Sequence, residues 1–207
     1  MKKILFLLLA AVIFTSCSTD SDSTDSSFFN LNNGNLWVYK RYYSSDNINY
    51  MASGQIDSVR VEGDTVINSI SYSKLVHRIY QANVFSYQRK DFLKVDTNGH
   101  LVNETGYVLH PGTDMSYQGF RNVTFGQESN TVGTITEQLQ NPFETNVEGV
   151  SYYVYSYYGN FISSVASIPN NYIFYQCKEG VGLVNQHCSS VSGTLCYEDR
   201  LVYYDLN

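Results

Sequence analysis

Short runs of β-type residues recur along the chain at close spacing, and this pattern constrains the fold more than any other feature. The runs are rich in Val, Ile, Thr, Tyr and Phe, which suit a pleated, half-buried surface. No long window after the first 27 residues carries the i, i+3, i+4, i+7 apolar spacing of a helix. We therefore predict strands at 36–43, 55–63, 65–80, 84–90, 92–96, 119–126, 131–139, 150–158, 171–177 and 200–206.

Turn signals separate these runs. The pair Asn98-Gly99 is the strongest hairpin signal, because both residues tolerate the positive φ that a tight turn needs. Strands spaced this regularly, with no helices between them, predict an all-β fold. We expect a single antiparallel β domain, built as a sandwich or as an open or half barrel. The predicted turns are 62–65, 96–100, 110–114, 141–146 and 168–171.

Composition supports a sheet and excludes some partners. The chain has 19 Tyr, 11 Phe and only three Pro, and Tyr fits a strand surface with one apolar side and one wet edge. With 19 acidic against 13 basic residues, nucleic acid and anionic membrane surfaces are poor partners. The sequence contains no phosphate-binding loop, dinucleotide fingerprint or EF-hand loop, so we predict no cofactor.

The N-terminus has the layout of a secretory signal. Lys2 and Lys3 precede the apolar run Ile4–Phe14. This run is shorter than the roughly 20 residues that a helix needs to span a bilayer. The residues that end at Cys17 resemble a bacterial lipobox, which implies a signal peptide at 1–16 and a lipid on the sulfur and amine of Cys17. A plain secretory signal with an incidental cysteine is the alternative.

Residues 17–27 consist of Ser, Thr and Asp after the cysteine, with no aliphatic or aromatic side chain. Such a segment predicts a disordered, charged tether, and it leaves 28–207 as one folded domain. Several acyl chains together would anchor the protein stably in a membrane. The acidic tether also resembles the surface-export signal of Bacteroidetes lipoproteins. We predict an outer membrane lipoprotein, at the periplasmic face or the cell surface.

Two short motifs stand near the ends of the predicted domain. The first has Gly34, Trp37 and Tyr39 in the pattern G-x-x-W-x-Y, and the second is E-G-V-G-L-V, which contains Gly180 and Gly182. This pair resembles a broad group of uncharacterised, β-rich Bacteroidetes envelope lipoproteins, and the resemblance implies an all-β envelope domain with no established activity. Residues two apart on a strand share one face, so we interpret the motifs as core and turn devices. A ligand contact is the alternative.

Three cysteines follow the lipobox cysteine, and the periplasm is oxidising enough for a disulfide. Cys188 and Cys196 bracket a Ser/Gly-rich turn, so we predict that they form a disulfide. Pairing of Cys177 with Cys188 is the competing arrangement. A metal site could also be drawn from these cysteines and His187. The close C-x-x-C spacing typical of zinc is missing, however, and we predict no metal site.

The sequence offers no convincing catalytic residues. It has no G-x-S-x-G string. His77 lies in a predicted strand and is interpreted as packed. His110 and Asp114 are interpreted as loop residues, with a catalytic or metal pair as the alternative. Glu144 and Glu148 are more simply solubilising loop residues than glycosidase carboxylates.

Two positions match a modification pattern. The strings D-S-V at 57–59 and D-T-V at 64–66 resemble the Bacteroidetes O-glycosylation signal. We therefore name Ser58 and Thr65 as possible glycosylation sites.

The function hypotheses come from different classes. The first is a non-catalytic binding module for a glycan or peptide, with Tyr153, Tyr155 and Tyr157 as candidate ligand contacts, because exposed aromatic faces suit sugar rings. It predicts a row of exposed aromatic side chains. The second is a lipid or hydrophobe carrier, which predicts a half-barrel cavity lined by Phe, Leu and Val. Two hypotheses remain. One is a hydrolase, and the other is a structural role without a small ligand.

Overall fold

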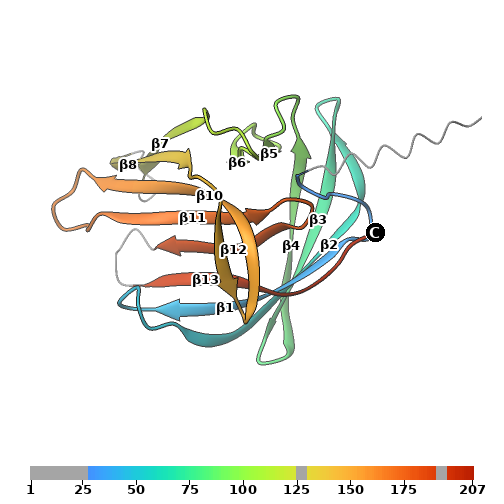
Figure 1. Cartoon of the computed structure of the whole chain (residues 1–207), viewed down its shortest axis with the longest axis horizontal. Helices are drawn as coiled ribbons and strands as arrows, with labels where there is room; N and C mark the ends of the chain where they lie inside the picture. Colours follow the sequence, from blue (N-terminus) through green and yellow to red (C-terminus); the bar gives the residue numbers. More distant parts are fainter. Residues whose placement is uncertain (1–27, 125–129, 190–194) are drawn as a thin grey trace, which may run out of the picture.

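The computed structural model describes residues 28–124, 130–189 and 195–207. The predicted signal peptide 1–16, Cys17 and the tether 17–27 lie outside the described residues. Within the described ranges the chain forms strands and no helix, so the all-β prediction is confirmed (Figure 1). The strands are β1 (Leu36–Ser44), β2 (Met51–Ile67), β3 (Ile70–Gln81), β4 (Val84–Val95), β5 (Leu101–Asn103), β6 (Val108–His110), β7 (Gln118–Thr124), β8 (Thr131–Leu139), β9 (Phe143–Val147), β10 (Val150–Ser163), β11 (Asn171–Lys178), β12 (Gly182–Ser189) and β13 (Cys196–Asp205).

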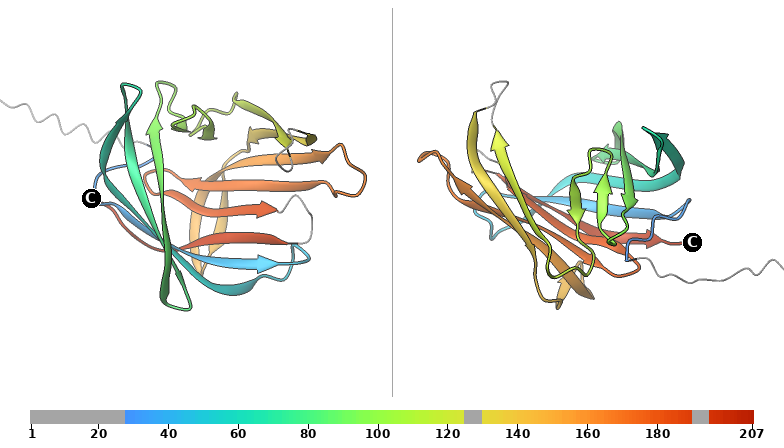
Figure 2. Two further views of the ribbon diagram at one scale, coloured as in Figure 1. Left: turned by 180° about the vertical axis from the view of Figure 1, so that it is seen from behind. Right: turned by 90° about the horizontal axis from the view of Figure 1, so that it is seen from above.

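All the strands belong to one antiparallel sheet. Its order is β6-β5-β4-β3-β2-β1-β13-β12-β11-β10-β8-β7, and β9 pairs with the first part of β10. The first and last strands, β1 and β13, pair in the middle of this order. Figure 2 shows the sheet curling so that β2–β4 and β8–β11 form two walls facing each other. The architecture is the predicted open barrel. No helix in the described ranges has the length and apolarity to cross a bilayer.

The two edges of the sheet, β6 and β7, are joined by side chains rather than by a strand ladder in the described residues. The Tyr107 hydroxyl, just before β6, donates a hydrogen bond to Glu137 Oε1 on β8 at 2.9 Å. His110 Nε2, at the end of β6, lies 3.2 Å from the carbonyl oxygen of Tyr155 on β10. We call these contacts the seam. They close the half barrel where backbone pairing stops.

Two predicted boundaries in the first half of the chain were wrong. The run 65–80 is not one strand, because the chain reverses at Asn68 and Ser69, whose φ values are 50° and 65°. The predicted turn 62–65 is instead a β-bulge inside β2, where Gly63 has a φ of 73° and the pairing with β3 shifts. The hairpin predicted at Asn98-Gly99 is confirmed, since it joins β4 to β5.

The β9–β10 hairpin adds a short second layer. Part of the segment predicted as a turn at 141–146 is strand β9, which pairs with the start of β10. In Figure 1 this hairpin crosses over β12 and β13. It buries Val147, Tyr152 and Val154 in the same cluster as Val184 of β12. This packing covers the outer face of the sheet there and leaves the inner face for the site described next.

Candidate functional site

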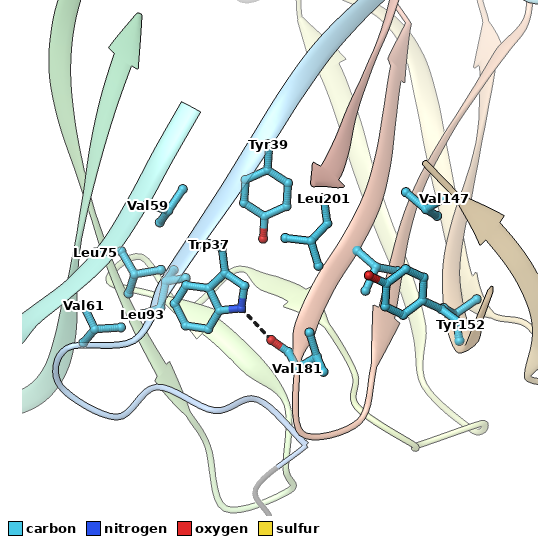
Figure 3. Packing of buried hydrophobic residues seen from close by; sticks show 12 residues of the cluster. Trp37, Tyr39, Val59, Val61, Leu75, Leu93, Val147, Tyr152, Val181 and Leu201 are labelled. Atoms are coloured by element: carbon cyan, nitrogen blue, oxygen red, sulfur yellow. Dashed lines mark hydrogen bonds between the residues drawn. The ribbon is translucent and has the colours of Figure 1, made fainter. Parts of the chain in front are cut away.

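A cavity of about 350 Å³ lies on the inner face of the half barrel. Side chains from the strands β1 to β6 and β11 to β13 line it, together with the segment that precedes β1. Its two ends differ in chemistry. The apolar end, part of which appears in Figure 3, is formed by Trp37, Val59, Leu75, Leu93, Leu101 and Leu109. The charged end is formed by Asp57, His77, Arg89, Asp91 and Asp199.

The two sequence motifs meet at the apolar end. Trp37 Nε1 donates a hydrogen bond to the Val181 carbonyl oxygen at 2.7 Å (Figure 3). The Tyr39 hydroxyl donates to the Leu183 carbonyl oxygen at 3.0 Å. Burial raises the pKa of Tyr39 well above its ordinary value. Gly182, with a φ of 94°, lets the chain turn into β12 beside these rings. The motifs therefore act as core and turn devices, as expected, and they also form a cavity wall.

The charged end is built around His77. Its Nδ1 lies 2.8 Å from Asp57 Oδ2, and its Nε2 lies 3.1 Å from Asp91 Oδ2. Arg89 Nη1 donates to the same Asp91 oxygen at 2.6 Å. Burial lowers the pKa of His77, but the hydrogen bonds to the two carboxylates outweigh burial, and the net pKa is raised. Arg89 Nη2 lies 3.1 Å from His77 Nδ1 and acts in the opposite direction, so the two carboxylates favour the protonated form against both burial and this guanidinium.

Sequence reasoning assigned His77 to packing and missed its partners. A signal was present in the spacing, because Asp57 and His77 each stand two residues from a core residue on their strands. Asp57 precedes Val59 on β2, and His77 follows Leu75 on β3. Residues two apart share a face of a strand. A charged residue on the core-facing side of a strand therefore indicates either a buried ion pair or the polar wall of a cavity.

A second ion pair lies on the opposite wall of the charged end. Arg41 binds both oxygens of Asp199, with Nε and Nη2 each at 2.7 Å. Gln186 Nε2 also donates to Asp199 Oδ2 at 2.6 Å. The Arg41 guanidinium lies over the Tyr197 ring, 4.4 Å from its centroid. Both charges of this pair are therefore matched within the protein.

The outer face carries a different cluster, which we call the outer stack. His187 on β12 is fully buried beside two aromatic rings. Its ring centroid lies 4.6 Å from that of Tyr172 and 5.3 Å from that of Phe174, and both pairs are stacked. Burial lowers the pKa of His187 to about 4. The imidazole is therefore neutral at physiological pH.

The hydrogen bonds of the outer stack fix the tautomer of His187. Ser189 Oγ donates to Asn171 Oδ1 at 2.6 Å, so it accepts from His187 Nε2, which lies 3.0 Å away. His187 Nδ1 is then an acceptor for the Tyr50 hydroxyl at 3.0 Å. In this tautomer His187 cannot take the proton of Ser189. The pair therefore stabilises the fold rather than forming an activated nucleophile.

The three tyrosines predicted as ligand contacts do not form one exposed row. Tyr153 is 61% exposed, whereas Tyr157 is only 1% exposed. Tyr155 packs edge-on against Phe28, with ring centroids 5.3 Å apart. The three share a strand face, but β10 passes from the exposed hairpin into the body of the half barrel. The predicted aromatic platform is thus corrected to one exposed ring and two packed ones.

The predicted disulfide is not formed, and Cys177, Cys188 and Cys196 are all free thiols. Cys188 stands opposite Tyr197, and Cys196 stands opposite Ser189. The two cysteines are offset by one residue, so their side chains point to opposite faces of the sheet. Cys177 lies on β11, away from the turn, and burial raises the pKa of its thiol far above the ordinary value.

The same alternation separates the residues of the metal alternative. His187 and Cys188 are consecutive on β12, so they face opposite sides of the sheet. Across 28–124, 130–189 and 195–207, no group of three or more His, Cys, Asp or Glu side chains is placed to hold a metal ion.

His110 and Asp114 do not pair with each other. Asp114 Oδ2 lies 3.1 Å from His100 Nε2, in the loop that follows β6. His110 belongs to the seam, and burial lowers its pKa to about 4. The catalytic or metal alternative for this pair is therefore wrong in the form proposed.

The remaining sequence candidates lie on strands or at turns outside the cavity. Glu144 accepts a hydrogen bond from Ser151, and Glu148 accepts one from Tyr42. Neither contact brings the two carboxylates together across a cleft. Ser58 and Thr65 are both half-buried on β2, and their glycosylation stays a prediction.

Comparison with known proteins adds the fold and little more. No protein-family model matches the chain, and no curated protein matches it. The chain is similar to the crystal structure of a predicted exported protein with a YmcC-like fold from Bacteroides fragilis. The TM-score is 0.51 at 13% identity, over 86% of this chain and 98% of that one. A predicted lipoprotein from Parabacteroides distasonis gives a TM-score of 0.44 at 14% identity over the same shares.

Proposed function

We propose that this protein is an envelope lipoprotein, anchored through Cys17, that binds a small amphipathic ligand without catalysing a reaction. The cavity with an apolar and a charged end carries the proposal. Its volume lies at the small end of the roughly 300 to 1,000 Å³ range of ligand sites. The ligand is therefore a small molecule, with its apolar part against Trp37 and its polar group near His77.

The location follows from the N-terminal sequence. A signal layout, a lipobox-like string ending at Cys17 and an acidic tether support a location at the outer membrane, at the periplasmic face or the cell surface. The solved structure that shares the fold is itself described as an exported protein, which supports an envelope location.

A non-catalytic role is supported by how the polar groups are used. Both ring nitrogens of His77 face carboxylates, and His187 is sealed in the outer stack. Cys188 lines the cavity, but burial raises the pKa of its thiol, and the hydroxyls of Tyr175 and Tyr197 lie against it. A neutral thiol is a poor nucleophile. No activated nucleophile therefore faces the cavity among the described residues.

The geometry favours the cavity hypothesis over a surface platform for a glycan or peptide. A platform needs aligned, exposed rings, and Tyr157 is buried while Tyr155 is packed on Phe28. The apolar end instead has the Leu and Val lining that the carrier hypothesis predicts. Its size fits one small amphipathic molecule rather than a lipid with several chains.

Trp37 allows a direct test, because it is the only tryptophan of the chain and lines the cavity. The protein would be made with Cys17→Ser, so that no lipid is attached, and titrated with hexan-1-ol while Trp37 emission is recorded. We expect a saturable change in emission. Leu109→Phe, which fills the apolar end, should weaken binding at least fivefold.

Ile162→Phe is the matched control, since Ile162 is exposed on β10 and does not line the cavity. It should leave hexan-1-ol affinity within about twofold. A linear, non-saturating response, or equal effects of the two Phe variants, would refute binding in the cavity.

A further inference from the structure

Resting on the proposed ligand cavity, we propose that the cavity selects a ligand whose polar group is a protonated primary amine, and that Asp57 Oδ1 receives it. The inference concerns the chemical class of the ligand, which the cavity shape alone does not define. It depends on one unsatisfied atom and on how the neighbouring charges are matched.

Asp57 is only 9% exposed and uses one of its two oxygens. Its Oδ2 accepts from His77 Nδ1 at 2.8 Å and lies 3.8 Å from Arg89 Nη2. Its Oδ1 is buried and has no hydrogen-bond partner within the described part of the chain. A buried acceptor without a partner is unfavourable and uncommon. Because a carboxylate accepts only, the group that completes it must be an N–H or O–H donor.

The cations of the charged end are already matched by carboxylates. Arg89 is bound to Asp91, and Arg41 is bound through two hydrogen bonds to Asp199. An anionic head group would find no unmatched cation here, because Arg89, Arg41 and His77 are each bound to a carboxylate. An ammonium group would meet the free oxygen of Asp57 instead. The charges therefore favour a cationic donor over a carboxylate or phosphate.

The spacing of the two ends limits the ligand's length. Asp57 and Val59 are two residues apart on the same face of β2, and Val59 pairs with Trp37 on β1. Two residues along a strand span about 7 Å. A short apolar group joined to the amine by a few carbons can therefore reach both Asp57 and the apolar end.

Binding of the amine should be coupled to the proton on His77. The ligand's ammonium group and protonated His77 both interact with Asp57. An ammonium group bound there therefore lowers the pKa of His77. The other charged groups facing His77 are Asp91 and Arg89 from β4, and both are paired with each other. Amine affinity is therefore expected to increase with pH as His77 loses its proton.

The test compares three probes with the same tail, namely hexylamine, hexan-1-ol and hexanoate, by Trp37 emission on the Cys17→Ser protein. We expect hexylamine to bind at least tenfold more tightly than hexanoate. Asp57→Asn should weaken hexylamine about tenfold and leave hexan-1-ol within about twofold. Asp64→Asn, on the same strand but outside this cavity, should change neither.

Equal or tighter binding of hexanoate would overturn the inference, as would an unchanged probe ratio in Asp57→Asn. Should that variant not fold, the wild-type pH series decides, because hexylamine affinity must rise as the pH increases above 6.5 through the titration of His77, while hexan-1-ol affinity stays flat. If hexan-1-ol binds saturably but hexylamine is not preferred, the proposed amine selectivity is wrong and the proposed ligand cavity stands. Failure of all three probes to bind overturns the proposed function and the selectivity with it.

Discussion

Two buried histidines on opposite faces of the sheet show what controls the charge of a buried imidazole in this protein. His77 is 8% exposed and His187 is 0% exposed, so burial hardly distinguishes them. Yet the pKa of His77 is raised, whereas the pKa of His187 is lowered to about 4. His77 lies 2.8 and 3.1 Å from two carboxylates, whereas His187 packs on aromatic rings and hydrogen-bonds to hydroxyls, with its nearest carboxylate, Glu198, at 3.9 Å.

The difference separates a site that can respond to a ligand from one that cannot. The charged end holds a histidine with a raised pKa beside a cavity and an unsatisfied oxygen. In the outer stack both ring nitrogens of His187 have partners, and the ring packs against Tyr172 and Phe174. We therefore expect substitutions in the outer stack to affect stability, and those at the charged end to affect protonation and binding.

The largest effect is expected for His187→Ala. Removing the ring leaves a void beside Tyr172 and Phe174 and takes partners from Tyr50 and Ser189. The free energy of unfolding should fall by about 2 to 4 kcal/mol, as for other large-to-small core changes. Urea denaturation measures it. His187→Phe keeps the stacking and should lose only about 1 to 2 kcal/mol, for the lost hydrogen bonds. Equal losses would contradict the role of stacking.

The pH dependence should have opposite signs for the two histidines. His187 stays neutral in the folded state down to about pH 4, but in the unfolded chain it binds a proton below about 6.5. Its contribution is therefore complete above pH 6.5 and is lost as the pH falls toward 4, by at most about 1.4 kcal/mol per pH unit. His110, with a pKa also lowered to about 4, acts in the same direction.

For His77 the sign is reversed. Its raised folded pKa contributes stability that is complete below about pH 6.5, and this stability is lost as the pH rises through the folded value. Unfolding free energies measured across pH 4 to 9 should peak near neutrality. His187→Phe should flatten the acid side alone, and His77→Gln the alkaline side alone. A variant that flattened the opposite side would show that the histidines were assigned wrongly.

A smaller effect is expected for Asp91→Asn. Asp91 is partly exposed, and its own pKa is lowered, since the pairing with His77 and Arg89 outweighs its burial. Losing this charge should lower the pKa of His77, which NMR titration of its ring protons would report. The stability loss should stay within about 1 kcal/mol, because the pair is partly solvated. Asp64→Asn should not move the His77 titration.

The smallest effect is expected for Arg78→Ala, which removes a surface ion pair with Glu62 at 2.7 Å. Both side chains are about one-third exposed, and such pairs contribute roughly 0.2 to 1 kcal/mol. Added salt should reduce the difference between wild type and variant. A loss of unfolding free energy above 1 kcal/mol that did not depend on salt would contradict this prediction. It would mean that an exposed ion pair of this protein can stabilise the fold as much as a buried one.

The class of fold and the core motifs could be predicted from the sequence, because they depend on local properties. These are the residue types of each strand and the two-residue spacing that puts Trp37 and Tyr39 on one face. Cross-strand register is not local. The β-bulge at Gly63 shifts the pairing of β2 with β3, and a single-residue offset separates Cys188 from Cys196. A shift of one residue moves a side chain to the other face. The His77 cluster, assembled from three strands, was missed for the same reason.

The seam has a consequence for how fast a bound molecule can leave. His110 belongs both to the seam and to the cavity lining, so the wall of the cavity there is held by side chains. Side-chain and loop motions occur in nanoseconds to microseconds, whereas breaking a strand ladder requires local unfolding. Dissociation should therefore be limited by the contacts of the ligand itself. We therefore expect a ligand bound in the proposed cavity to have a short residence time.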